Sequence, residues 1–482
     1  MKTAVLLGAS ICIVRGAPPT KLTGFVLPQT YADSFGAKCL DGTPPCFAIR
    51  PADPSTWVVF FEGGGWCFGD TPADTISSCI GRAGGGLGSS NGYMNSSQSI
   101  GGILSTDPVR NPAYYNATLV FVHYCDGASG TSAATQPVPV PADFDFSAHN
   151  PADAADFPWY TPPSTAPAQI WFRGRANIIA TMSYLRDNAG LDAARTVILT
   201  GGSAGATTVF IGADMMRGLL PATAHVVAAP DAGYFLDQPR ASNSSEFWYR
   251  EQFQGADSVW NATGAGTLGD ACMRYFASEP WRCYLAENNA LFTTTPLYVS
   301  NSPIDMWALG NILSLGCVPT MNNQSIPAGK ACAPEQWATL QQWWSTFHAT
   351  LSPLLARNAR TGAFIPSCFV HEINVDYCSG QTLPNCRGWA SYTVAPPAGG
   401  PVVTLSEALP EWVNSVTADW TATLAACEDA VKRAPEDIDF KRVTGKWPQE
   451  HAGATLGGFG PGQDVDQLTY PMNPSCYYPP GR

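Results

Sequence analysis

The sequence predicts an α/β fold, in which a mostly parallel β-sheet is flanked by helices and joined by long loops. Two observations indicate this fold: nearly continuous apolar segments of strand length recur along the chain, and segments with helical periodicity lie between them. The charged fraction is only 13%, with 46 Gly and 41 Pro in 482 residues, which is typical of a loop-rich globular protein. Alternating strands and helices favour a parallel sheet covered on both faces.

Five segments are expected to form the buried strands of this sheet, because each is rich in β-branched and aromatic residues. They are residues 57–61 (WVVFF), 119–124 (LVFVHY), 196–200 (TVILT), 225–229 (HVVAA) and 297–300 (LYVS). Helices are expected between and after them, over residues 168–188, 206–220 and 334–356.

The domain boundaries are set by composition. An apolar run between Lys2 and Arg15 is too short to cross a bilayer and has the form of a secretory signal, so we assign residues 1–16 to a signal peptide. Later apolar stretches are of strand length, so no membrane span is expected. We predict one domain over residues 17–432 with a Pro-rich surface insertion at 136–168, followed by a C-terminal extension at 433–482.

The charge balance limits the partners of the protein. The net charge is −12 and no Lys/Arg-rich run occurs, so the chain lacks the footprint of a nucleic-acid-binding protein. No repeat of solenoid or propeller period is present. The Gly/Ser/Asn-rich segment 82–99 is expected to be a second surface loop. Nothing indicates an oligomer, so a monomer is the default expectation.

Cysteine usage agrees with a secreted protein. One of 15 Cys lies in the proposed signal, and the remaining even number suits a disulfide framework. Close spacings suggest the local pairs Cys39/Cys46, Cys67/Cys79, Cys272/Cys283 and Cys317/Cys332. No Cys-x₂-Cys or His cluster has metal-ligand spacing, so no metal or other cofactor is expected. Five glycosylation sequons fit the secretory pathway, at Asn95, Asn116, Asn243, Asn261 and Asn323.

The candidate nucleophile is Ser203, in the G-x-S-x-G run Gly201-Gly202-Ser203-Ala204-Gly205. The run follows the expected strand 196–200 and precedes the expected helix 206–220. Small neighbours let a strand turn sharply into a helix and leave the serine hydroxyl exposed, as acyl transfer requires. A second match centred on Ser90 lies in a Gly/Ser loop with no strand before it, so we favour Ser203.

The candidate oxyanion hole begins in the segment Glu62-Gly63-Gly64-Gly65-Trp66, which follows the expected strand 57–61. Successive glycines let backbone N–H groups converge where a Cβ would obstruct them. We predict that the amides of Gly64, Gly65 and Ala204 stabilise the oxyanion. A plain turn after the strand is the alternative.

The candidate base is His371, which lies after the last expected helix in a cysteine-rich loop. It is preferred because this type of fold takes its catalytic residues in the order Ser, acid, His. The other histidines lie in a strand, in the Pro-rich insertion, on a helix or without supporting context: His123, His149, His348, His225 and His451.

The candidate acid is Asp305, the first carboxylate beyond the expected strand 297–300. Its predicted role is to hold the tautomer of His371 and to stabilise the imidazolium. Asp231 and Asp237, after the strand 225–229, remain alternatives, whereas Glu372 is disfavoured because it adjoins the base.

The sequence resembles the pectin acetylesterase and Notum family of α/β-hydrolase esterases, over residues 24–389. Seven ordered segments carry the resemblance: FFEGGGWCF (60–68), GGILSTDPVRNPAYYNATLVFVHYCDGAS (101–129), IWFRG (170–174), ILTGGSAGA (198–206), DAGYFLD (231–237), SNSPIDMWAL (300–309) and SCFVHE (367–372). The resemblance places the family's Ser, Asp and His on Ser203, Asp305 and His371, and its oxyanion segment on Gly64 and Gly65.

Within this family the details point in two directions. Gly65, the run 124–129 and the run 172–174 resemble the polysaccharide-deacetylating branch, which implies Trp66, Asp126 and Arg173 as substrate-binding residues. The run 371–373 resembles the Notum branch, and the insertion 136–168 departs from both.

Three functions therefore remain open. A secreted O-acetyl esterase acting on pectin or a related cell-wall polysaccharide is preferred, although a net charge of −12 would repel a polyanionic pectin. The second is a lipid-protein deacylase of the Notum type. The third is a catalytically silent secreted glycan-binding protein.

Overall fold

The computed structural model describes residues 18–144, 159–160, 167–318, 332–357, 360–376, 388–394, 401–418 and 463–465. The proposed signal peptide lies outside these residues. So do His149, His451, Asn323 and most of the Pro-rich insertion and of the C-terminal extension.

The centre of the protein is a mixed sheet with the strand order β14-β11-β10-β9-β8-β3-β5-β2-β1-β4. Strands β14 through β5 run parallel, and β2, β1 and β4 add antiparallel pairs at one edge. In chain order the strands are β1 (Leu22–Val26), β2 (Cys46–Arg50), β3 (Asp53–Phe61), β4 (Ser97–Gln98), β5 (Ala117–Val122), β8 (Thr196–Gly202), β9 (His225–Asp231), β10 (Leu297–Ser300), β11 (Thr361–Ile365) and β14 (Gln463–Val465). Two separate two-stranded sheets pair β6 (Val138–Pro139) with β7 (Gln169–Ile170) and β12 (Thr393–Val394) with β13 (Val403–Thr404).

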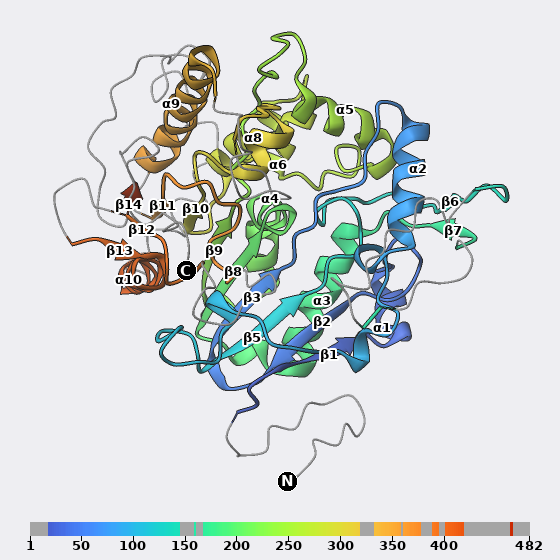
Figure 1. Cartoon of the computed structure of the whole chain (residues 1–482). Coiled ribbons are helices and arrows are strands. Elements are labelled where there is room, and N and C mark those ends of the chain that lie inside the picture. The colour runs from blue at the N-terminus through green and yellow to red at the C-terminus, as the bar shows by residue number, and fades with distance from the viewer. Residues whose placement is uncertain are drawn as a thin grey trace.

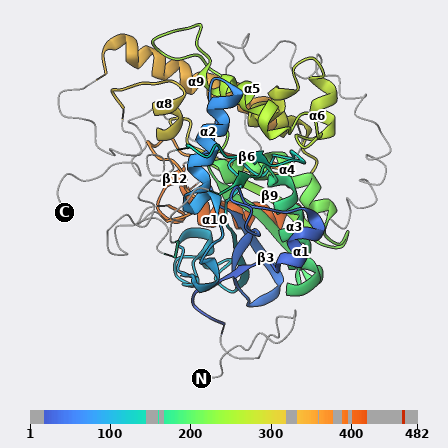
Figure 2. The same cartoon turned by 90° about the vertical axis from the view of Figure 1, so that its right-hand side faces the viewer.

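Helices cover the sheet and form a cap at one of its ends. Figures 1 and 2 both place α5, α6, α8 and α9 together at that end, and α1 and α3 beside the sheet. No described helix combines the length and apolar character that a bilayer crossing requires. The helices are α1 (Gln29–Phe35), α2 (Pro72–Ala83), α3 (Gly174–Ala189), α4 (Ala204–Gly218), α5 (Trp248–Trp260), α6 (Asp270–Tyr275), α7 (Ala286–Asn289), α8 (Met306–Asn311), α9 (Pro334–Ala356) and α10 (Leu405–Ala418).

Both faces of the sheet are buried, as the apolar strands predicted. Along β3, Trp57, Val59 and Phe61 join one core with α1, α3 and α4, while Val58 and Phe60 join a second core with α10. This split follows from the alternation of side chains along a strand. A strand apolar at every position can therefore sit only in a sheet covered on both sides.

All five expected strands are present, as β3, β5, β8, β9 and β10. The expected helices 206–220 and 334–356 correspond to α4 and α9. The prediction for 168–188 was wrong at its start, because Gln169–Ile170 pairs with Val138–Pro139 and α3 begins only at Gly174. The amide of Gly174 is bonded to the Ser132 hydroxyl, 2.9 Å away, which fixes this start.

Two other sequence predictions need correction. His371 follows α9, the last helix that the sequence predicted, but it does not follow the last helix of the chain, because the unpredicted α10 comes after it. The segment 82–99 is only partly a surface loop: residues 91, 92, 94, 95, 97 and 99 are exposed, whereas Tyr93 is fully buried, with ring centroids 5.0 Å from His123 and 4.8 Å from Trp159. Its small residues let the chain pack closely, and a Cβ on Gly88 would meet the Arg82 carbonyl oxygen at 2.3 Å.

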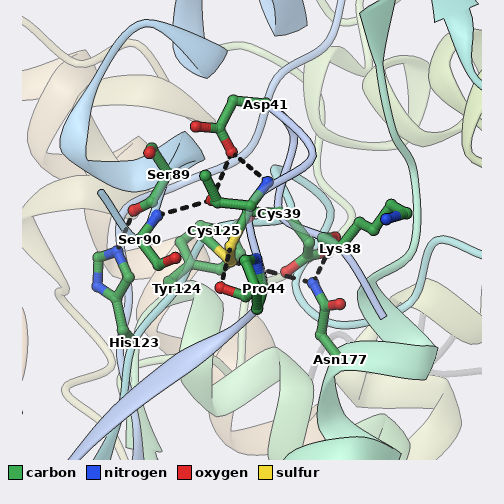
Figure 3. Close-up of a disulfide and its surroundings, with 12 residues drawn as sticks. Lys38, Cys39, Asp41, Pro44, Ser89, Ser90, His123, Tyr124, Cys125 and Asn177 are labelled. Atoms are coloured by element: carbon green, nitrogen blue, oxygen red, sulfur yellow. Dashed lines mark hydrogen bonds between the residues drawn. A yellow bond between two sulfur atoms is a disulfide. The ribbon is translucent and has the colours of Figure 1, made fainter. Parts of the chain in front are cut away.

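Four disulfides are described, and three of them are expected pairs: Cys67–Cys79, Cys272–Cys283 and Cys317–Cys332. The pair Cys39/Cys46 was wrong. Cys39 bonds Cys125 after β5, as Figure 3 shows, and Cys46 is a buried free cysteine. As the first residue of β2, Cys46 points into the core on the α10 side, so its strand position directs it away from Cys39.

Candidate active site

Five segments at the ends of parallel strands meet at the capped end of the sheet. Four of them come after β3 (residues 62–66), β8 (Ser203), β10 (Asp305) and β11 (His371), and the fifth is Asp231, the last residue of β9. The carboxyl ends of neighbouring parallel strands share one edge, which is where ligand sites of open α/β sheets form. The strand order β11-β10-β9-β8-β3 therefore places these segments side by side.

Ser203 occupies a strained turn between β8 and α4. Its φ of 54° and ψ of −121° lie outside the regions that ordinary residues favour. The turn fits only because its neighbours are small: a Cβ on Gly205 would lie 2.0 Å from the Phe61 carbonyl oxygen, and one on Gly201 2.6 Å from it. The serine is thus held against the end of β3, at the tip of a turn that has the geometry of a nucleophile elbow.

His371 and Asp305 are directly hydrogen-bonded. The imidazole Nδ1 lies 2.7 Å from Asp305 Oδ2, and both side chains are buried. The other carboxylate oxygen of Asp305 accepts a 2.9 Å bond from the amide of Ala308 and so caps α8. One carboxylate therefore both begins the helix and orients the ring, leaving Nε2 as the nitrogen directed elsewhere.

The surroundings of His371 orient its imidazole ring and raise its pKa. Phe235 and Trp307 stack near it, with ring centroids 6.2 and 6.3 Å away. Burial alone would lower the pKa of His371, but the charge and hydrogen bond of Asp305, with the charges of Glu372 and Asp231, outweigh it and raise the pKa to about 9.

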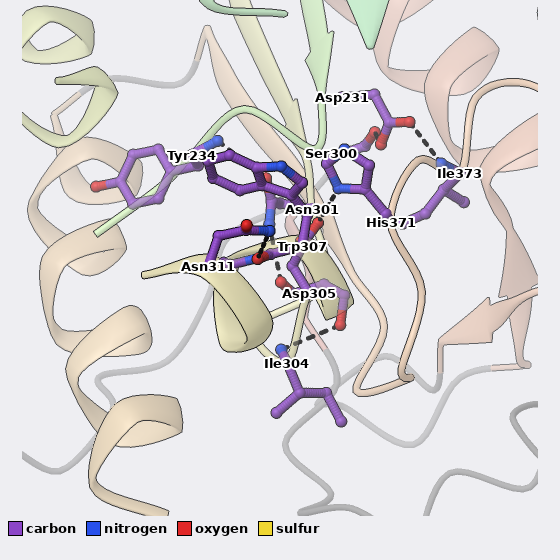
Figure 4. A network of polar contacts seen from close by, with 12 residues as sticks. Asp231, Tyr234, Ser300, Asn301, Ile304, Asp305, Trp307, Asn311, His371 and Ile373 are labelled. Atoms are coloured by element: carbon purple, nitrogen blue, oxygen red, sulfur yellow. Dashed lines mark hydrogen bonds and ion pairs between the residues drawn. The ribbon is translucent and has the colours of Figure 1, made fainter. Parts of the chain in front are cut away.

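The two competing aspartates have other partners. Asp231 accepts bonds from the Ser300 hydroxyl (2.5 Å) and from the amides of Ile373 (2.5 Å) and Asn374 (2.9 Å). Figure 4 shows it on a different side of His371 from Asp305. Burial raises the pKa of Asp231 to about 7. Asp237 forms an ion pair with Arg250 at 2.5 Å.

Asp231 braces the site. Its backbone oxygen accepts a 3.0 Å bond from the amide of Ser203, while its carboxylate holds the two amides that follow Glu372. A single residue thus ties the nucleophile elbow to the segment that carries His371.

The glycine loop is held by its carbonyl groups. Arg82 donates to the carbonyl of Gly64, and the hydroxyl of Tyr124 donates to that of Gly65 at 2.7 Å. In a trans peptide the N–H points opposite to the C=O, so these bonds direct the amides of Gly65 and Trp66 away from Arg82 and Tyr124. At Gly64 and Gly65, φ is 128° and 64°, which favours glycine.

Glu62, which precedes this loop, is also anchored. Its Oε2 lies 2.6 Å from Nδ1 of His123 and accepts a 2.8 Å bond from the amide of Tyr124. On the other side of the elbow, Ala204 is the first residue of α4, where the helix has no preceding turn to bond its amide. This amide and the positive end of the helix suit a developing oxyanion.

A cavity of about 800 Å³ adjoins these residues. Gly63, Gly64 and Glu372 form its wall next to the elbow, and a Cβ on Gly63 would lie only 3.0 Å from the Cβ of Ser203. Its polar wall is the segment Asn95–Ser99, and its remaining lining includes Glu62, Asp376 and the apolar or aromatic side chains Phe60, Leu87, Ile100, Phe121, Trp159 and Val375.

The three expected substrate-binding residues lie elsewhere in the fold. Trp66 is buried, donates to Gln252 at 2.8 Å and packs on Trp307. Asp126 accepts bonds from the amides of Ala128 and Gly130, so it stabilises its own loop. Arg173 donates to the carbonyls of Gly36 and Ala134. None of the three lines the cavity beside Ser203.

Sequence reasoning weighed Glu372 only as an acid and missed its packing on Gly202, as well as the contacts of Arg82 and Tyr124 with the glycine loop and the bracing role of Asp231. A signal existed for Tyr124, which stands in the quoted run 101–129. The contact between Arg82 and the glycine loop could not be inferred, because it forms only when the tertiary structure places the end of α2 beside Gly64.

The profile of the pectinacetylesterase family matches residues 23–149 and 150–419. The chain belongs to the pectinacetylesterase family. This member of the family is similar to pectin acetylesterase 11 of Arabidopsis thaliana, with 30% identity over 382 residues that cover 77% of the chain and 84% of the relative. It is also similar to the palmitoleoyl-protein carboxylesterase notum1′ of Xenopus laevis, with 26% identity over 358 residues, 70% of the chain and 60% of the relative.

A solved structure shares the fold of this pectinacetylesterase family member. The Wnt deacylase Notum from Drosophila aligns with a TM-score of 0.60 and 22% identity, over 82% of the chain and 94% of the solved chain. The α/β-hydrolase-like architecture is therefore confirmed, and family membership makes the protein a carboxylesterase.

Proposed function

We propose that the protein is a secreted serine esterase that removes O-acetyl groups from pectin or a related polysaccharide. His371 takes the proton of Ser203, whose hydroxyl oxygen attacks the ester carbonyl. The amides of Gly64, Gly65 and Ala204 stabilise the oxyanion, and Asp305 stabilises the imidazolium. His371 then protonates the departing sugar hydroxyl, and a water molecule repeats the sequence on the acyl-enzyme.

The observation that carries this proposal is the 2.7 Å bond between His371 and Asp305 at the strand edge that also bears the Ser203 elbow. Support for a sugar substrate comes from the adjoining cavity. Its wall at Asn95–Ser99 offers hydroxyl and amide groups, and Trp159 offers an aromatic face. A fatty acyl chain would favour a pocket lined by apolar side chains alone.

Support for secretion comes from the disulfides and from the exposed glycosylation sequons. Four disulfides and a further bridge at Cys368 are typical of oxidising compartments. The described sequon asparagines, Asn95, Asn116, Asn243 and Asn261, are all exposed. Expression through a secretory pathway followed by glycosidase treatment tests this part: unglycosylated or retained protein would contradict it.

A chain-length series of aryl esters tests the substrate class. Acetate should give the highest kcat/KM, with a steady fall through butyrate, octanoate and palmitate. The similarity to notum1′ favours a fatty-acyl deacylase as the second candidate, which would invert this order. Failure to be labelled by an organophosphonate probe would instead support a catalytically silent glycan-binding protein.

Tyr124→Phe should lower kcat about tenfold and leave KM nearly unchanged, because its hydroxyl anchors the Gly65 carbonyl, and a loosened glycine loop holds its oxyanion donors less well in the transition state. The variant removes one oxygen, which holds the Gly65 carbonyl and accepts the Ser129 amide at 3.0 Å. Steady-state kinetics on an aryl acetate measure the effect. The matched control is Tyr234→Phe, whose buried hydroxyl donates to the Thr350 carbonyl instead. Equal kinetics in both variants would refute a positioning role.

The pH profile should rise toward alkaline pH, because the general base must be neutral and the pKa of His371 is about 9. The kcat/KM for an aryl acetate, followed from neutral to alkaline pH, measures this. The stability of the folded protein should change in the opposite direction and fall as the pH rises. Because the folded-state pKa of His371 is raised above the ordinary 6.5, its protonated ring stabilises the folded protein. This contribution to the free energy of unfolding is complete below pH 6.5 and is lost as the pH rises through 9. A profile that is flat above neutral pH would contradict the assignment.

A further inference from the structure

The cavity beside Ser203 carries negative charge. Three of its lining residues have carboxylates, Glu62, Glu372 and Asp376, and none of the described residues that line it is a lysine or an arginine. Arg110 lies 3.5 Å from Asp376, and His123 lies 2.6 Å from Glu62.

Glu372 is the carboxylate nearest to the nucleophile. A Cβ placed on Gly202 would lie 2.5 Å from its Cδ, so the carboxyl group rests directly on the residue before Ser203. The point where a Cβ on Gly63 would stand is 3.3 Å from Glu372 Oε1 and 3.0 Å from the Cβ of Ser203. Both side chains thus flank the same glycine of the oxyanion loop.

The backbone holds Glu372 in this place. Its φ is 51°, a conformation that favours glycine, and the two amides that follow it are bonded to the buried Asp231. Its side chain is only 7% exposed, and its charge contributes to raising the pKa of His371 and of Asp231. An acidic group is thus fixed on the cavity wall that adjoins the turn at Ser203.

We propose that Glu372 is a specificity-determining residue that selects uncharged O-acetylated saccharide units and rejects units with a free carboxylate. This inference rests on the proposed esterase function and names its substrate class. A carboxylate accepts hydrogen bonds from sugar hydroxyls but repels a uronate at short range. The polar wall at Ser96–Ser99 offers further hydroxyl and amide groups, and the net charge of −12 repels a polyuronate at long range.

One acetylated oligogalacturonide tests the proposal in two forms, the free acid and the full methyl ester, which differ in charge and in one methyl group on each uronate unit. At low ionic strength the methyl ester should have a kcat/KM about tenfold higher or more. The ratio should shrink in high salt, because screening shortens the reach of charges. Equal turnover of both forms, or preference for the free acid, would overturn the proposal.

Glu372→Gln identifies the residue responsible. The ratio of kcat/KM for the methyl ester to kcat/KM for the free acid should fall several-fold. A change in the reactivity of His371 affects both substrates equally and therefore does not alter this ratio. Glu335→Gln, an exposed glutamate on α9 outside the cavity lining, should keep the wild-type ratio. An unchanged ratio in Glu372→Gln would overturn the assignment. If that variant does not fold, the wild type still shows whether free-acid units are rejected, and equal turnover of the two forms would overturn the proposal.

The proposed function is checked separately with an aryl acetate, which carries no sugar charge. Wild-type protein that cleaves the aryl acetate without discriminating between the two oligosaccharides contradicts only the role of Glu372. Protein that cleaves no acetyl ester contradicts the esterase function itself.

Discussion

Ser203→Ala is expected to reduce turnover of an aryl acetate by roughly 10⁴-fold or more, because no acyl-enzyme can form without the hydroxyl. The residual rate would come from the oxyanion donors and from substrate binding. The fold should tolerate the change, since the elbow geometry depends on the neighbouring glycines and on the amide of residue 203, which is bonded to Asp231. Pre-steady-state kinetics should show a burst in the wild type and none in the variant.

The control for this experiment is supplied by the second G-x-S-x-G match. Ser90 lies in the buried segment between α2 and β4, where its amide is bonded to the Thr43 hydroxyl at 3.0 Å. Ser90→Ala should therefore keep wild-type turnover and phosphonate labelling. If Ser203→Ala retained most of the activity, the nucleophile would have to be sought elsewhere.

Asp305→Asn is expected to lower kcat about 10⁴-fold with little loss of stability. An asparagine side chain still caps a helix, so the bond to the amide of Ala308 can persist. Its amide group, however, presents a donor to Nδ1 of His371. The proton then moves to Nε2, and the imidazole can no longer accept the serine proton.

The pH profile separates this effect from general damage. Removing the charge of Asp305 should move the alkaline inflection to lower pH, because that charge and its hydrogen bond raise the pKa of His371. Asp237→Asn breaks an ion pair with Arg250 instead and should leave both kcat and the inflection near wild type. An Asp305→Asn variant with wild-type kcat would mean that another carboxylate supports the ring.

The sequence predicted the fold correctly for strands that are buried on both faces of the sheet, because such strands are apolar along most of their length. The segments at 57–61, 196–200 and 297–300 are apolar at nearly every position, and each became a central parallel strand. Strands β1, β2 and β4 at the antiparallel edge were not predicted. Strand β14 pairs with β11 from within the expected C-terminal extension, a contact across the chain that no local pattern encodes.

The cysteines illustrate the same limit. Three pairs close short loops, which spacing alone suggests. Cys39 joins Cys125, which is 86 residues away, because the antiparallel pairing of β2 and β5 brings the end of β5 beside it. The position of Cys46 in β2 decides which face of the sheet its side chain points to. The spacing between two cysteines carries no information about this orientation.

The sequence by itself predicted the order of the candidate catalytic residues: a serine in a tight turn, a later carboxylate and a later histidine, each after a segment of strand character. Only the tertiary structure decided which aspartate meets the ring, because Asp231 and Asp305 both lie at the ends of parallel strands. Asp305 reaches His371, while Asp231 is turned to the amides after Glu372. The tertiary structure likewise placed Glu372 on Gly202, since side-chain direction depends on backbone torsions and packing that residue spacing does not carry.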